Sequence, residues 1–163
     1  MAKYLDDSQL LDYFEKIVKD FIVETISNTN NWWAEYIPQQ IREEASQRYQ
    51  RSKKISNVLN KEDYEIIHYI NFDSYEKIIS RKDNWRKHFE DIFVEKGIFE
   101  YKMQIILSLR NDIRHGRSLN VINKIRLRLH CYDIISQIFE AKDSDGQNFR
   151  KELMQKLGFG EDW

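Results

Sequence analysis

The chain has 163 residues, of which 41% are apolar and 33% are charged, and its formal net charge is −1. This length and composition predict one folded domain with a real core and exclude a disordered chain. The small net charge excludes a protein that holds nucleic acid through an overall basic field, so any polyanion site must be local. Five glycines and one proline are too few for the turns of a many-stranded sheet.

Apolar residues recur every three or four positions along most of the chain, which predicts helices. The expected helices cover 6–27, 38–54, 60–71, 73–82, 83–93, 100–115, 120–139 and 148–159. Their expected caps are Asp7 or Ser8, Asn60, Asp73, Asp83 or Asn84, and Gly158. Breaks are expected at 28–33, 96–99 and 143–147. The predicted fold class is all-α, in a single domain over 1–163 without repeats or linkers.

The two long helices, 100–115 and 120–139, are expected to lie antiparallel in a bundle because the connection between them is short. Their core-facing residues are expected to be Met103, Ile106, Leu107, Ile113, Ile122, Ile125, Leu129, Tyr132, Ile135, Ile138 and Phe139. The helix that opens at Pro38 has few large apolar positions, so we expect it on the surface.

Features of the sequence also bear on the compartment. Cys131 is the only cysteine, which rules out an internal disulfide and suits a reducing compartment. The N-terminal MAKYLDDSQL has no apolar signal-peptide core, and no stretch approaches the roughly 20 apolar residues of a membrane span. We therefore expect a cytoplasmic protein with no membrane partner, and we expect Cys131 in the core.

Several common site patterns are missing from the sequence. Neither GxGxxG nor GxxxxGK[ST] occurs, and one cysteine with four scattered histidines cannot form a structural zinc site. No cofactor and no metal is therefore expected. The tryptophans could stack on nucleobases, but packing is the preferred interpretation for Trp85 and for the pair Trp32 and Trp33. Trp163 is terminal and is expected to be loosely held.

The stretch LRNDIRHGR, residues 109–117, ends a helix whose earlier turns are apolar. From Arg110 to His130 the sequence has six arginines and lysines but one acid, Asp112. Two interpretations fit this local bias. One is a solvated helix end, because basic side chains stabilise a helix C-terminus and Gly116 is a natural stop. The other is a phosphate site.

The helical register divides these side chains between two faces. Arg110, Arg114 and Arg117 form one stripe, and Asn111 and His115 share a second face. Around the helix axis, His115 lies about 140° from Arg110. One helix therefore cannot aim both at the same atom, unless the long arginine reaches around it or a second subunit supplies its copy.

Residues 110–115, RNDIRH, fit the R-x(4–6)-H motif of the HEPN superfamily (higher eukaryotes and prokaryotes nucleotide-binding domains). The preceding NWWAEYIP (31–38) and FDSYEKIISRKDNWRKHFEDIF (72–93) resemble the branch found in RNA quality-control endonucleases and in prokaryotic defence proteins. The resemblance covers about residues 30–140. It implies a HEPN-like helical bundle with additional short helices.

The resemblance also implies a function, that of a metal-independent endoribonuclease acting as a homodimer on RNA. Its catalytic residues would be Arg110, Asn111 and His115, with Arg114 and Arg117 following the RNA backbone. Histidine exchanges protons near neutral pH, so His115 would act on the RNA 2′-hydroxyl or the leaving 5′-oxygen. Arg110 would hold the scissile phosphate. The expected products are a 2′,3′-cyclic phosphate and a 5′-hydroxyl.

Three functions remain open from the sequence. The first is this ribonuclease, in a toxin or phage-defence setting, with an antitoxin or fused regulatory domains as candidate partners. The second is a non-catalytic HEPN module that binds RNA, a nucleotide or a partner protein. The third is an unrelated helical interaction domain. The chain could also be a domain of a longer protein.

Overall fold

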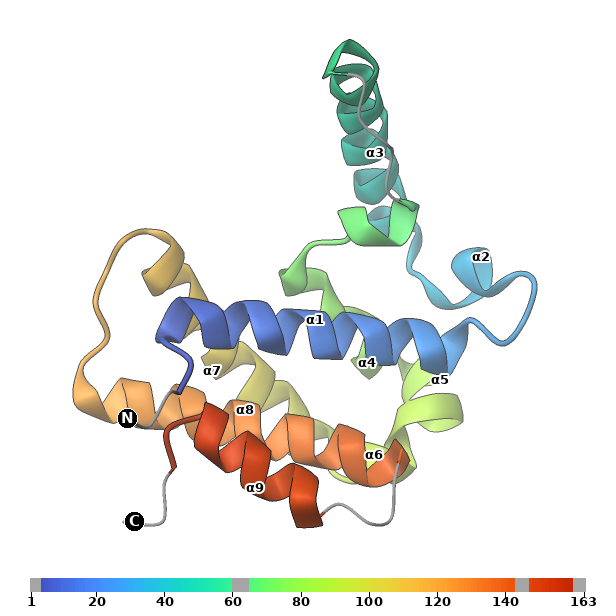
Figure 1. Ribbon diagram of the computed structural model, residues 1–163. Coiled ribbons are helices and arrows are strands. Elements are labelled where there is room, and N and C mark those ends of the chain that lie inside the picture. Colours follow the sequence, from blue (N-terminus) through green and yellow to red (C-terminus); the bar gives the residue numbers. More distant parts are fainter. Residues whose placement is uncertain (1–3, 60–64, 143–146, 160–163) are drawn as a thin grey trace.

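The computed structural model describes residues 4–59, 65–142 and 147–159, and every regular element in these ranges is helical, which confirms the all-α class. The α-helices are α1 (Asp7–Ile26), α2 (Trp32–Tyr36), α3 (Gln39–Leu59), α4 (Tyr75–Ser80), α5 (Lys82–Asn84), α6 (Glu90–Phe93), α7 (Lys96–Arg114), α8 (Val121–Lys142) and α9 (Gln147–Lys156). Two 3-10 turns, η1 (Ile66–Tyr69) and η2 (Phe72–Ser74), and a π-helical turn, η3 (Trp85–Phe89), connect them. Figure 1 shows α3 standing apart from the bundle.

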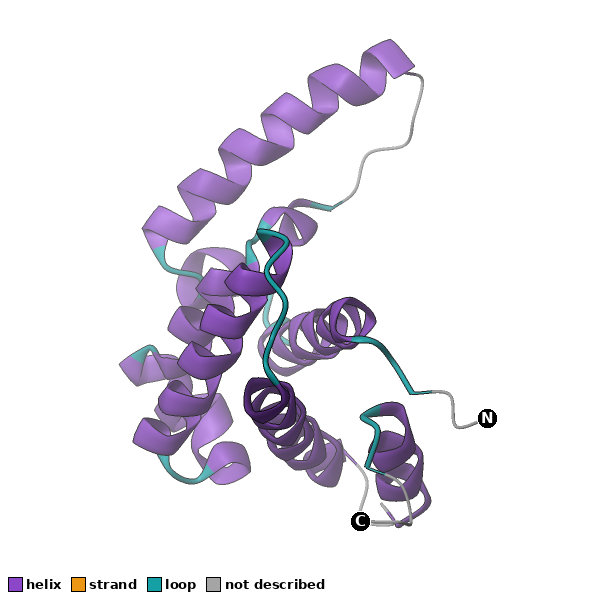
Figure 2. Cartoon of the chain, turned by 90° about the vertical axis from the view of Figure 1, so that its left-hand side faces the viewer, coloured by secondary structure: helices purple, strands orange, loops and turns teal. Residues whose placement is uncertain are grey.

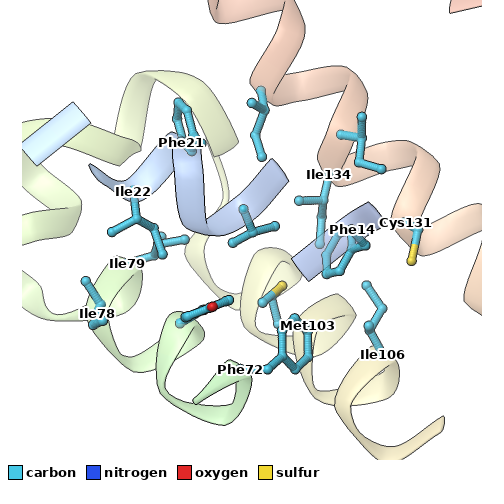
Figure 3. Close-up of a cluster of buried hydrophobic side chains, with 14 of the residues drawn as sticks. Phe14, Phe21, Ile22, Phe72, Ile78, Ile79, Met103, Ile106, Cys131 and Ile134 are labelled. Carbon is cyan, nitrogen blue, oxygen red and sulfur yellow. The ribbon is translucent and has the colours of Figure 1, made fainter. Parts of the chain in front are cut away.

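The core forms where α1 meets the short helices, α7 and α8 (Figure 3). Phe14 of α1 meets Phe72 edge to face with ring centroids 5.8 Å apart. Two turns further along α1, the Phe21 ring also meets the rings of Phe89 and Phe93 edge to face, with centroids 5.9 Å and 6.0 Å apart. Such aromatic pairs add to the stabilisation from burial. α1 is therefore the element around which the others pack.

The first residue of α1 is set by Asp6. Its side chain accepts from the backbone N–H of Gln9 at 2.8 Å, and the Gln9 side chain accepts from the backbone N–H of Asp6 at 3.1 Å. This reciprocal pair is a capping box. The predicted caps, Asp7 and Ser8, are wrong, because both lie inside the helix and their side chains contact α7 or α8 instead.

Arg128 of α8 joins the two ends of the described chain. Its guanidinium donates to the carbonyls of Leu5 at 3.0 Å and Leu157 at 2.9 Å and pairs with Asp7 at 2.9 Å. Its side chain is only 12% exposed. Gly158, with φ 80°, then ends the last helix as predicted. The N- and C-terminal segments therefore close onto one side of α8.

The core-facing side of α8 differs from the predicted one. Ile122, Ile125 and Leu129 are exposed rather than buried, with exposed fractions of 60%, 38% and 47%. The fully buried residues of α8 are Leu127, Cys131, Ile134, Ile135 and Ile138. Apolar residues lie on both faces of this helix, so spacing alone could not choose between them. The result is an apolar strip on the outer side of α8.

The segment between α3 and α7 also departs from prediction. Asn60 lies outside the described residues, and of the helix expected over 60–71 only the η1 turn is observed among residues 65–71. The break expected at 96–99 is wrong, because α7 already begins at Lys96. The chain turns instead at Val94, with φ 66°, where the N–H of Glu95 donates to the carbonyl of Phe93 at 2.8 Å.

α3 projects from the bundle as a single helix (Figure 2). Only Ile41 and Ala45, near its start, are buried, which agrees with the predicted surface position. The η1 turn braces its middle, where Arg48 donates to the Tyr69 carbonyl at 3.0 Å and the Tyr69 hydroxyl donates to Ser52 at 2.7 Å. The outer turns lie beyond this brace.

Candidate functional site

The motif helix α7 ends in a well-defined turn. His115 is the C-cap, and Gly116 follows with φ 76°, a conformation that glycine adopts without strain. The N–H of Gly116 donates to the Ile113 carbonyl at 3.0 Å, and that of Arg117 donates to the Asp112 carbonyl at 2.9 Å. This is the Schellman pattern of helix ends. The backbone that carries His115 is thus fixed by the helix end.

Asn111 and His115 lie on the solvent face of this helix end. Both are exposed, and the N–H of His115 donates to the Asn111 carbonyl at 3.0 Å. The loop that leads from His115 to α8 forms one end of the bundle, at the left of Figure 1. The predicted separation from the arginine stripe therefore holds for Arg110 and Arg114, which contact α1, but not for Arg117, because α7 ends at Arg114 and Arg117 follows the Gly116 turn.

Arg110 is turned toward α1 and away from His115. Its Nε donates to Glu15 at 2.5 Å, and its guanidinium carbon lies 5.3 Å from the centroid of the Phe72 ring. Tyr75 lies in the same environment, where burial, followed by the charge of Glu15, raises the pKa of its hydroxyl. Arg110 and Glu15 are each about one-quarter exposed. Within one chain, Arg110 is part of the packing between α7 and α1.

Arg114 makes a second contact with α1. Its Nη2 lies 2.6 Å from Asp12, and its Nη1 donates to the Ser8 hydroxyl at 3.1 Å. Arg117 instead pairs within its own helix end, with Asp112 at 3.1 Å, and its side chain is 73% exposed. Of the three motif arginines, Arg117 is thus the one most open to solvent, next to His115 in the chain.

Acidic residues of α1 form ion pairs with several of the basic residues between Arg110 and His130. Besides the two arginine pairs, Asp7 contacts both Lys124 at 3.6 Å and Arg128 at 2.9 Å on α8. We call this set the α1 ion-pair seam: Asp7, Asp12, Glu15, Arg110, Arg114, Lys124 and Arg128. Sequence reasoning missed its acidic half because Glu15 and Arg110 lie 95 residues apart. The sequence indicates this contact only through the position of Glu15, an acidic residue that directly follows the core residue Phe14 in the first helix.

Other candidate groups take structural positions. Cys131 is fully buried, and burial raises the pKa of its thiol, as expected for a core residue. Burial also lowers the pKa of His88 and His130, and Trp85 is buried while Trp32 and Trp33 pack against the core. Trp163 lies outside the described residues.

The described ranges contain neither a metal-binding cluster nor a membrane-spanning helix. No three His, Cys, Asp or Glu side chains in them cluster in a way that could hold a metal ion. No helix in them has the length and apolar character needed to cross a bilayer.

The position of Arg110 predicts a measurable role in stability. Arg110→Ala should lower the free energy of unfolding by about 1–3 kcal/mol, because Glu15 would keep its partly buried charge without a partner. The matched change Arg117→Ala should cost no more than about 0.5 kcal/mol, since that pair is exposed. Urea unfolding of both variants, of Glu15→Ala and of the Arg110→Ala/Glu15→Ala double variant would measure the coupling between Arg110 and Glu15. Additive losses from Arg110 and Glu15 would contradict the seam.

No family model matches the chain, and no curated protein and no solved structure matches it. The resemblance to the HEPN superfamily thus rests on the motif and its helical setting. Function must therefore be inferred from the chemistry of the residues at the end of α7 and from the surfaces around them.

Proposed function

We propose that the protein is a metal-independent endoribonuclease that acts in the cytoplasm, in a toxin or defence setting. The proposal rests on one observation above the others. Asn111 and His115 share an exposed face at a helix end whose backbone hydrogen bonds fix it. A proton-transferring side chain on such a rigid support, open to a large substrate, is what RNA cleavage through the 2′-hydroxyl requires.

In the proposed reaction, His115 accepts the proton of an RNA 2′-hydroxyl as its oxygen attacks the adjacent phosphorus. The bond to the 5′-oxygen breaks, and that oxygen takes a proton from a second acid, which is the partner copy of the histidine or water. The products are a 2′,3′-cyclic phosphate and a 5′-hydroxyl. Asn111 would orient the imidazole or a phosphate oxygen, and Arg117 would hold the neighbouring phosphate.

In this proposal Arg110 both keeps its ion pair with Glu15 and binds an RNA phosphate. Its Nε is occupied by Glu15, so a phosphate would bind the terminal nitrogens while the ion pair stays in place. From that position Arg110 faces away from His115 of the same chain. The arginine of one chain would therefore serve the histidine of a second, which makes a homodimer part of the proposed site.

The outer side of α8 supports such a dimer. Its apolar strip begins directly after the loop that carries Arg117 and includes Ile122, Ile125 and Leu129, all exposed. Exposed apolar patches of this kind are typical of protein interfaces. A twofold contact through this strip would place the two copies of 109–117 near the dimer axis.

A second function is favoured by a different observation. Arg110 and Arg114 are both occupied by acids of α1, which leaves one chain with little free positive charge beside His115. That arrangement suits a non-catalytic module that binds RNA, a nucleotide or a partner protein. RNA binding without cleavage would identify it.

The ribonuclease predicts a strong dependence on His115. His115→Ala should lower the cleavage rate by about 10²–10⁴-fold, because a general acid–base contribution of that size is lost. His68→Ala removes another exposed histidine from the η1 turn and should leave cleavage unchanged. Incubation of total RNA with each protein in EDTA, followed by gel analysis of the products, makes the comparison.

Folding and chemistry are separated by a thermal unfolding scan of the same preparations. His115 is exposed at a helix end, so its replacement should leave the unfolding temperature near that of the wild type. If the dimeric wild-type protein and the His115→Ala variant give the same RNA products, the ribonuclease proposal fails and the non-catalytic module takes its place.

The dimer has its own test on α8. The double change Ile122→Lys/Leu129→Lys puts charge into the apolar strip and should convert the dimer to monomer with loss of cleavage. Met154→Lys, at a partly exposed apolar position of α9, is the control and should leave the dimer intact. Light scattering at matched concentrations measures the mass. A wild-type monomer that cleaves RNA at full rate would contradict the dimeric site.

A further inference from the structure

The outer half of α3 combines three features that packing does not explain. It projects from the bundle (Figure 2), its side chains are largely exposed, and its charge has one sign. From Ala45 to Leu59 the sequence has four basic residues and no acid, and the next acids, Glu62 and Asp63, fall outside the described residues. We call the exposed cations Arg51, Lys53 and Lys54 the arm cluster.

The arm cluster differs from the motif arginines in its partners. Arg110, Arg114 and Arg117 each lie within ion-pair distance of a carboxylate. Arg48, at the base of the arm, pairs with Glu44 at 3.6 Å. Within the described part of the chain, none of the three arm-cluster cations has such a carboxylate. Among the described residues, the arm cluster is thus a local group of cations without a paired carboxylate, whereas the motif arginines at the end of α7 are each paired.

We infer that the outer half of α3 is a docking arm for single-stranded RNA. This inference rests on the proposed function, to which it adds the element that holds the substrate. The arm and the RNA are complementary in charge, because the positive side chains of this segment, which has no acidic residue between Ala45 and Leu59, attract the negative phosphates of an RNA backbone. Exposed cations that have no carboxylate partner among the described residues lose no such ion pair on binding, whereas the motif arginines must share or exchange theirs.

The length of the arm suits an extended strand. The part of α3 from Ala45 to Leu59 corresponds to about 22 Å of helix. Arg51 and Lys54 lie one turn apart on adjoining faces, so they can contact successive phosphates. Ile55, Val58 and Leu59 are exposed at the tip and can pack on unstacked bases, which single strands offer and duplexes do not.

A membrane surface fits the arm less well than RNA does. A helix that lies on a bilayer needs an apolar face along most of its length. On α3 the exposed apolar residues are confined to the last turns, while the preceding turns carry Arg51, Lys53 and Lys54. The inner apolar residues, Ile41 and Ala45, are already buried against the bundle.

The test compares two triple variants of the full chain with equal charge changes. Arg51→Gln/Lys53→Gln/Lys54→Gln removes the arm cluster, and Lys82→Gln/Arg86→Gln/Lys151→Gln removes three exposed cations elsewhere. Binding to a short fluorescent 2′-O-methyl RNA is followed by anisotropy over a salt series, because this RNA lacks the attacking hydroxyl and cannot be cleaved. Vesicles of phosphatidylserine and phosphatidylcholine are titrated in parallel.

The arm variant should bind this RNA about tenfold more weakly or worse, and its salt slope should fall by about 1.4, the value for the two lost single-strand phosphate contacts of Arg51 and Lys54. The control variant should bind as the wild type does. The docking inference would be overturned by equal losses of RNA affinity in both variants or by wild-type affinity in the arm variant. It would also be overturned if the wild type bound no RNA, or if the arm cluster were needed for binding to vesicles but not to RNA. A cleavage assay tests His115 separately. If RNA binding depends on the arm cluster but no RNA is cleaved, the docking inference stands and the ribonuclease proposal fails. If cleavage depends on His115 but the arm variant binds RNA as the wild type does, the ribonuclease proposal stands and the docking inference fails.

Discussion

The ion pairs between α1 and the helices α7 and α8 constrain both the fold and the site. Glu15 and Asp12 pair with Arg110 and Arg114, and Asp7 pairs with Arg128, so these three arginines face α1. The Glu15–Arg110 and Asp7–Arg128 pairs are partly buried, and such pairs are costly to break from one side only. They fix how α7 lies against α1, and they decide which side chains of the motif remain available to a ligand.

A separation of roles follows from this seam. Arg110 connects α1 to the aromatic ring of Phe72, while Asn111 and His115 face solvent from the same helix. A cluster of exposed cations without paired carboxylates among the described residues lies on α3, which contacts the bundle mainly through its base and the η1 turn. Chemistry at a rigid helix end and substrate capture on a projecting helix would then be divided between distant parts of the chain.

The sequence was sufficient for the helical class and for the long helices, because periodicity and caps act locally. It was insufficient for the inner face of α8, where Ile125 and Leu127 are equally apolar and only packing against α1 and α7 selects the buried one. It also could not show that Arg110 meets Glu15, since that contact is made by the fold and not by neighbours in the chain. The end of α7 at His115 and Gly116 was predictable because glycine favours positive φ.

One measurement tests the division between seam, helix end and arm most directly: an NMR titration of the isotope-labelled protein with a short uncleavable RNA. We predict that resonances of His115 and of residues 51–54 shift together, while the Arg110 Nε–H signal remains observable because Glu15 still holds it. Loss of the Arg110–Glu15 signal on RNA binding, with no shifts at His115 or in the arm, would contradict the division.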